Sequence, residues 1–165
     1  MNNSKTSRRL EPGEYWFDDL IVGDHYGTGH IVVTEAHIVG FAGLSGDFFE
    51  LHMDDEFARS HGFPARVAHG LLGLAMADGL KNRSPVRIVG IAALGWNWNF
   101  RGPIFVGDRI GVTVVVNAKR LNSRRDRGIL TLGFTVSNQL DKVVQEGETT
   151  LITPLRPAGS VHTSA

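Results

Sequence analysis

The 165-residue chain contains no cysteine. Disulfides, thiolate nucleophiles and cysteine-ligated metals are therefore excluded, and this composition suits the reducing cytosol. The chain also lacks a surplus of either charge, because 17 Lys and Arg residues balance 17 Asp and Glu residues. Neither nucleic acid nor an anionic membrane is indicated as a partner by that balance.

Long apolar runs are missing as well. No stretch approaches the ~20 residues that a membrane helix needs, and the polar N-terminal residues lack the apolar segment of a signal peptide. Apolar residues make up 42% of the chain, which is ordinary for a globular protein. We expect one soluble, cytoplasmic domain over residues 13–155, between flexible tails at 1–12 and 156–165.

The first half of this domain mixes short elements with one long helix. Residues 30–34 read as a strand, after which Thr34 can cap a helix that begins at Glu35. Asp54 or Asp55 can cap a short helix that runs through Ser60. The strongest helix extends from about residue 69 to residue 80 and is apolar on nearly every side, which predicts a buried helix.

The second half is strand-like almost throughout. β-branched residues dominate five predicted strands, at residues 86–92, 96–100, 109–121, 128–137 and 143–153. Trp96, Trp98 and Phe100 alternate with asparagines, so this aromatic stripe belongs to the sheet core or to a dimer contact. The sum is an α+β fold, in which an antiparallel sheet wraps around one central helix.

Asp47 and His52 form the most informative pair in the sequence. On a continuous helix, side chains five residues apart would point about 140° away from each other. A loop through residues 48–50 instead lets both converge on one water, as a general acid/base pair that adds or removes water beside a carbonyl. The alternative is that Asp47 caps a turn and His52 is a partly buried structural histidine. Phe48 and Phe49 can make the surroundings apolar.

Gly70 begins the long helix and can serve that chemistry. Its backbone N–H lies at the positive end of the helix dipole, where it can stabilise the enolate oxygen of a reacting thioester. Close packing against a neighbouring segment is an equally good reason for a glycine at this position.

These residues lie in two motifs: Phe41-Ala-Gly-Leu-Ser-Gly-Asp-Phe-Phe-Glu-Leu-His52 and Val67-Ala-His-Gly70. Together they resemble the signature of the MaoC-like, (R)-specific enoyl-CoA hydratases, which have the hot-dog fold. The stretches 100–110 and 17–24 are similar to further parts of the family pattern, so the resemblance covers about residues 14–153.

The resemblance implies a homodimer whose two sheets join and whose substrate is an acyl-CoA. The implied reaction is the reversible syn hydration of a trans-2-enoyl-CoA to an (R)-3-hydroxyacyl-CoA, without a metal or redox cofactor. Asp47 and His52 would share the catalytic water, and the Gly70 N–H would bind the thioester oxygen. We expect substrate contacts from four further residues: Phe48, Phe49, His69 and Asp78.

Two departures from the family pattern bear on the substrate. Phe49-Glu50 replaces an Asn-Pro pair, and Glu50 is either a solvent-facing acid or a second carboxylate near the site. Asp78 stands where a small hydroxyl residue is common. It is an ordinary late-helix residue, or it orders the His52 region, or it recognises a polar group on a short or functionalised acyl chain.

Other polar clusters carry less information. Five histidines (residues 25, 30, 37, 61 and 162) show no metal-ligand spacing. Five basic residues either form a solvated hairpin tip or bind the phosphates of CoA. They are Lys119, Arg120, Arg124, Arg125 and Arg127. Two other functions remain open: an acyl-CoA thioesterase of the same fold, and a subunit that binds acyl thioesters without turnover.

Overall fold

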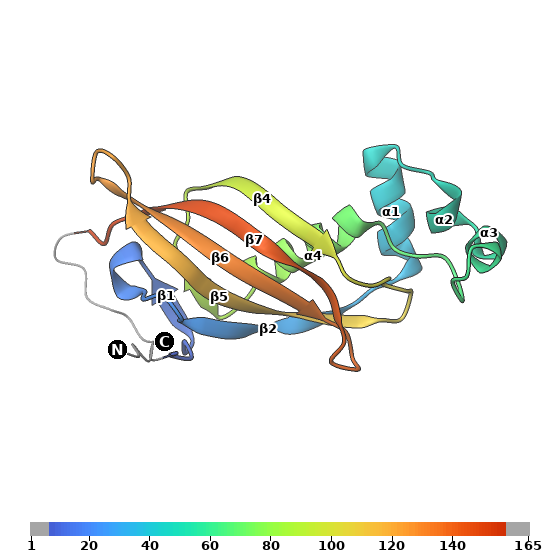
Figure 1. Cartoon of the computed structure of the whole chain (residues 1–165), viewed down its shortest axis with the longest axis horizontal. Helices are drawn as coiled ribbons and strands as arrows, with labels where there is room; N and C mark the ends of the chain where they lie inside the picture. Colours follow the sequence, from blue (N-terminus) through green and yellow to red (C-terminus); the bar gives the residue numbers. More distant parts are fainter. Residues whose placement is uncertain (1–6, 158–165) are drawn as a thin grey trace, which may run out of the picture.

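The computed structural model describes residues 7–157 and has one main antiparallel sheet of five strands (Figure 1). In spatial order these are β2 (His25–Val32), β5 (Arg109–Leu121), β6 (Arg127–Ser137), β7 (Val143–Pro154) and β4 (Ala92–Phe100). A separate parallel pair joins β1 (Gly13–Tyr15) to β3 (Val86–Ile88). A short 3₁₀ helix, η1 (Phe17–Asp19), follows β1.

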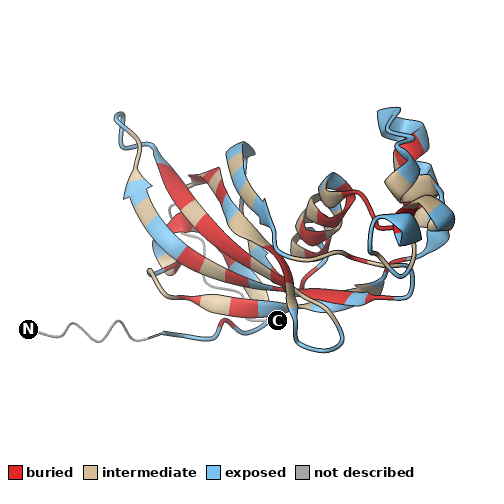
Figure 2. Ribbon diagram, turned by 45° about the vertical axis from the view of Figure 1, so that its right-hand side comes forward, coloured by how far each residue is buried: buried red, intermediate tan, exposed pale blue. Residues whose placement is uncertain are grey.

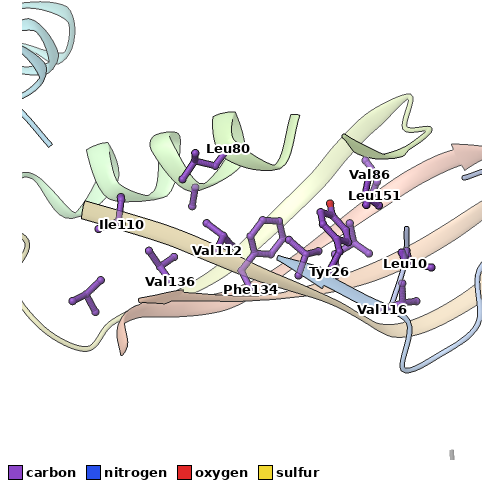
Figure 3. Close-up of a cluster of buried hydrophobic side chains, with 14 of the residues drawn as sticks. Leu10, Tyr26, Leu80, Val86, Ile110, Val112, Val116, Phe134, Val136 and Leu151 are labelled. Carbon is purple, nitrogen blue, oxygen red and sulfur yellow. The ribbon is translucent and has the colours of Figure 1, made fainter. Parts of the chain in front are cut away.

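Helix α4 (Gly70–Asn82) packs on one face of this sheet and builds the core with it. Figure 2 shows buried and exposed positions alternating along the strands, as expected when one face is covered. In β5, for example, Ile110, Val112, Val114 and Val116 are all buried. Figure 3 shows several of these side chains beneath Leu80 of α4. The α+β hot-dog fold expected from the sequence is therefore confirmed.

Helix α4 is not buried on every side, contrary to the sequence prediction. Leu72, Ala77 and Leu80 face the core, but Leu71 is 61% exposed and Ala75 is exposed too. The reason is geometric, because the sheet of a single chain covers only one side of the helix.

One predicted strand proves to be two. The chain over residues 86–92 first pairs with β1 and then crosses to β7, so β3 ends at Ile88 and β4 begins at Ala92. The crossing is held by the Val89 N–H, which donates to the Tyr15 carbonyl at 2.8 Å. The Ile91 N–H donates to the Ile152 carbonyl at the same distance.

Three further helices lie beyond the N-terminal end of α4: α1 (Glu35–Ser45), α2 (Glu50–Met53) and α3 (Asp55–Ser60) (Figure 1). Thr34 caps α1 as expected, with its hydroxyl accepting from the His37 N–H. Asp54, not Asp55, caps α3, because its carboxylate accepts from the Glu56 N–H at 2.8 Å. These helices carry the loop that the sequence singled out.

Part of the expected N-terminal tail is packed. Leu10 is buried, and its N–H donates to the His25 carbonyl at 2.8 Å. Arg8 pairs with the fully buried carboxylate of Asp24 at 2.7 Å. Arg156, assigned to the C-terminal tail, pairs with Asp19. The rest of both tails, at 1–6 and 158–165, lies outside the described residues. Within 7–157, no helix has the length and apolar character needed to cross a membrane.

Candidate active site

The Asp47 loop begins where α1 ends. Gly46 adopts a left-handed conformation, with φ of 80°, and its N–H donates to the Ala42 carbonyl. The Ser45 hydroxyl donates to the Phe41 carbonyl at 2.7 Å and accepts from the Asp47 N–H at 3.2 Å. This turn leaves the Asp47 side chain exposed.

The chain then places three ionisable groups together. A carboxylate oxygen of Asp47 and one ring nitrogen each from His52 and His69 lie within 4.8 Å of one another. His52 sits in the single turn of α2, and His69 immediately precedes α4. The predicted convergence of Asp47 and His52 is therefore present. His69 belongs to the same cluster.

His52 is held in one tautomer by the backbone. Its Nδ1 lies 2.7 Å from the Val67 carbonyl oxygen, which can only accept a hydrogen bond. Nδ1 must therefore carry the hydrogen, and Nε2 of the neutral ring keeps a lone pair. The Val67 N–H itself donates to the Leu51 carbonyl at 3.0 Å, which fixes the acceptor. His52 is thus prepared to accept a proton through Nε2.

His69 is a buried residue that contacts both Asp47 and His52. Its ring is 2% exposed and stacks on His52, with the centroids 3.9 Å apart and the planes inclined by 29°. Its Nε2–H donates to the Asp47 backbone carbonyl at 2.9 Å. This buried ring is not among the residues that line the cavity beside His52, so substrate contact by His69 stays a prediction, and the contacts it makes are with Asp47 and His52.

Gly70 packs closely against the ring of Phe100. A methyl group at this position would lie 2.6 Å from Cζ of Phe100, well inside van der Waals contact. Gln145 fixes the start of the helix to the sheet, because its Nε2 donates to the Gly70 carbonyl at 3.0 Å and its Oε1 accepts from Trp98. The close-packing interpretation is confirmed. The oxyanion role of the N–H stays a prediction.

A cavity of about 320 Å³ opens between these groups. Its walls come largely from apolar residues and from the chain that leads into β5. The full lining is His52, Phe63, Val67, Ala68, Gly70, Phe100, Arg101, Gly102, Pro103, Ile104 and Gln145. His52 and the first residue of α4 therefore face one common space.

Phe48 and Phe49 do not line this cavity. Both rings are at least half exposed. Phe49 packs edge-on against His52 and Phe57, at centroid distances of 6.0 and 5.7 Å. Glu50 is exposed on α2, in agreement with a solvent-facing acid.

Asp78 lies far from the cluster. It stands eight residues after Gly70, about 12 Å further along the helix axis at 1.5 Å per residue. Its carboxylate pairs with Lys81 at 2.6 Å and faces a different cavity. The suggestion that Asp78 orders the His52 region is therefore wrong.

The basic residues of the β5–β6 hairpin divide into two sets. Lys119 is not at the tip: its Nζ donates to the carbonyls of Phe17 and Leu20, at 2.8 and 2.5 Å. Burial lowers the pKa of Lys119, and this effect outweighs the nearby carboxylates, whose negative charge raises the pKa. Arg124 and Arg125 are exposed at the turn, as a solvated hairpin tip requires.

The aromatic stripe divides in the same way. Trp96 and Trp98 pack edge-on against Phe134 and belong to the sheet core. Phe100 is exposed and covers Gly70.

Asp47, His52 and His69 form the one group within 7–157 that meets a simple distance test for metal ligands. Their geometry suits a metal poorly. The two stacked rings hold their remaining lone pairs in planes inclined by only 29°, and Nδ1 of His52 and Nε2 of His69 already face carbonyl oxygens. Tetrahedral coordination would need both rings to turn.

Two supporting groups were not predicted from sequence. The Val67 carbonyl is a backbone atom, so no residue type marks it. Gln145 sits in a β-strand as an ordinary polar residue, and nothing in the pattern shows that it is 2% exposed.

Comparison with known proteins agrees with the motif resemblance. Residues 20–146 match the family model described as MaoC like domain. The protein MaoC of Klebsiella aerogenes is 38% identical over 71% of this chain, which spans only 35% of that relative. An (R)-specific enoyl-CoA hydratase of Aeromonas caviae is 33% identical over 72% of this chain and 85% of its own length.

A solved structure is similar as well. The MaoC-like dehydratase from Rhodospirillum rubrum superposes with a TM-score of 0.78 at 30% identity, covering 87% of this chain and 99% of that one.

Proposed function

Since this chain belongs to the MaoC-like domain family, we propose that it catalyses the reversible hydration of a trans-2-enoyl-CoA to an (R)-3-hydroxyacyl-CoA. Its relatives support a hydratase or dehydratase. The observation that carries the proposal is the meeting of the Asp47 carboxylate with His52, whose free Nε2 is available as a base, beside the Gly70 cavity.

In this mechanism a water binds between Asp47 and His52. The carboxylate orients it, and Nε2 of His52 accepts one proton as the water oxygen bonds to C3. The π electron pair of the C2–C3 double bond shifts to form a C1–C2 double bond, and the carbonyl π pair moves onto the thioester oxygen, which gives an enolate. Protonated His52 then returns the proton to C2 from the same face. One water is added in total, and no oxidant or reductant is needed.

Gly70 stabilises the enolate in this mechanism. Its N–H is one of the first in α4, which have no partner within the helix, and the helix dipole favours negative charge there. The largely apolar walls of the cavity strengthen that interaction, because fewer water dipoles compete for the developing charge.

The proposed assembly is a homodimer formed through β4. This strand is an edge of the sheet, so one side of it presents N–H and C=O groups that no strand within 7–157 pairs with. Most of its residues are exposed, and exposed apolar residues such as Leu94 and Leu71 lie on β4 and α4. Pairing two β4 edges would join the two sheets and cover the open side of α4.

The decisive test follows the ultraviolet absorbance of an enoyl thioester, with crotonyl-CoA as the substrate and Ellman's reagent to detect free thiol. Loss of absorbance without thiol release supports hydration. Thiol release would instead identify a thioesterase. Saturable binding of crotonyl-CoA with no turnover would favour the non-catalytic subunit and overturn the proposal for this substrate.

A further inference from the structure

A second cavity lies toward the other end of α4. Its volume is about 470 Å³, and it opens between the last turns of the helix and residues 87–93, over the inner face of the sheet. It shares no lining residue with the His52–Gly70 cavity. Four of its lining residues are polar and ionisable: Tyr26, Asp78, Lys81 and Arg87.

Tyr26 is the most informative residue in this cavity. The residue is only 2% exposed and lines this cavity, yet its hydroxyl has no hydrogen-bond partner in the described part of the chain. Figure 3 shows the hydroxyl on the α4 side of the sheet. Burial raises the pKa of Tyr26, and the charge of Asp78 raises it further, so the hydroxyl remains a neutral donor. A buried donor without an acceptor is rare in native proteins.

The charges around Tyr26 favour an anion. Asp78 is neutralised by Lys81, and Asn82 also donates to it. Arg87 is exposed at the rim, and its guanidinium has no hydrogen bond or ion pair within residues 7–157. The side chains of Asp78, Lys81 and Arg87 therefore carry a net charge of one positive unit. Two hydrogen-bond donors, on Tyr26 and Arg87, have no partner within residues 7–157.

We propose that this cavity binds the carboxylate of a small organic acid. One oxygen accepts from the Tyr26 hydroxyl, and the group pairs with the Arg87 guanidinium, whose planar fork matches a carboxylate. Apolar side chains that also line the cavity hold the carbon skeleton: Ile88, Ala92, Leu132 and Leu151. A free phosphate would leave these apolar walls without a partner, which favours an organic acid.

The carboxylate has two possible sources with the same chemistry: a free dicarboxylic acid, or the far end of an acyl group bound as a thioester. The inference does not rest on the proposed hydration, because none of these residues belongs to the Asp47–His52 cluster.

Calorimetric titration of the 165-residue chain with glutarate tests the site, with glutaramide as the uncharged control. We expect saturable binding of glutarate and none of glutaramide. Tyr26→Phe removes a single oxygen and Arg87→Gln removes the rim charge, so each should weaken glutarate binding about tenfold, the scale of one hydrogen bond to a charged group. Arg124→Gln, on the exposed hairpin, is the matched control and should bind like the unmodified protein.

A second arm separates the two sources with a long acyl group, because Asp78 lies about 12 Å along α4 from Gly70: sebacyl-CoA is compared with decanoyl-CoA in the same variants. If Tyr26→Phe weakens sebacyl-CoA but not decanoyl-CoA, the site receives the end of an acyl group. If it weakens only free glutarate, the ligand is a separate acid.

Several results would overturn the inference. One is binding of glutarate and of sebacyl-CoA that is equal in all variants. Another is the absence of carboxylate-dependent binding in both arms. Inorganic phosphate that displaces glutarate and binds more tightly is a third. A thermal melt of Tyr26→Phe guards against misfolding, and Arg87→Gln at the exposed rim provides the independent variant.

Discussion

The ring of His69 lies under that of His52, 3.9 Å away, while its Nε2–H holds the backbone carbonyl of Asp47. One buried side chain thus contacts both members of the proposed acid/base pair. This contact explains how an exposed carboxylate at the end of one helix and an imidazole in the next keep a fixed separation.

Asp47→Asn and His52→Ala test the pair directly. Each should lower turnover of an enoyl-CoA by at least ~10²-fold, since His52 is the group that takes and returns the proton and the Asp47 carboxylate is the acceptor that orients the water. Circular dichroism and thermal melts should show little change, because neither side chain is in the buried core. Near-normal turnover in either variant would exclude the role given to that residue.

His69→Phe separates positioning from catalysis. The phenyl ring can keep the stack with His52 but cannot donate to the Asp47 carbonyl. We expect kcat to fall about tenfold, corresponding to ~1.4 kcal/mol, with KM nearly unchanged because His69 is buried away from the cavity. An unchanged kcat, or a change confined to KM, would contradict this role.

Gly70→Ala should destabilise the fold by about 1–3 kcal/mol, the usual cost of overpacking, since its methyl group meets the ring of Phe100. Gly79→Ala is the matched control in the same helix, where the methyl meets nothing within 4 Å. There the better helix propensity of alanine should stabilise the protein by up to about 1 kcal/mol. Urea unfolding of both variants checks the contrast, and equal effects would refute it.

Leu94→Lys tests the proposed β4 dimer. A charge on an edge strand opposes strand pairing, so light scattering after gel filtration should show a shift from dimer to monomer. Leu140→Lys is the control, because Leu140 is exposed on the turn between β6 and β7. A monomeric unmodified protein, or a dimer that tolerates Leu94→Lys, would rule out this interface.

A chelator should leave turnover unchanged. Asp47, His52 and His69 are close enough to suggest a metal site, but the two rings are stacked and one nitrogen of each already faces a carbonyl oxygen. Activity measured before and after extended dialysis against EDTA decides the point. A loss restored by adding zinc would show that the rings reorient around a metal.

Interactions between residues close in sequence account for many of the features that the sequence predicted correctly. Thr34 as a helix cap and the glycine turn after α1 are decided by neighbouring residues, and both are found as expected. The alternation along β5 and β6 reflects burial of one sheet face, which the sequence records directly. The predicted strand over 86–92 failed because pairing with two different partners, β1 and β7, interrupts it.

The sequence by itself determined the wrapped-helix fold, the family signature and the identity of Asp47, His52 and Gly70 as candidates. Tertiary structure alone decided that Val67 sets the His52 tautomer, that His69 supports the pair, and that Asp78 faces a separate cavity with Tyr26. The physical reason is the sequence separation between the residues that interact. Helix caps and periodicity act over a few residues, whereas the bond from His52 to Val67 spans 15 residues and that from Gln145 to Gly70 spans 75. Contacts of that span exist only once the elements have packed.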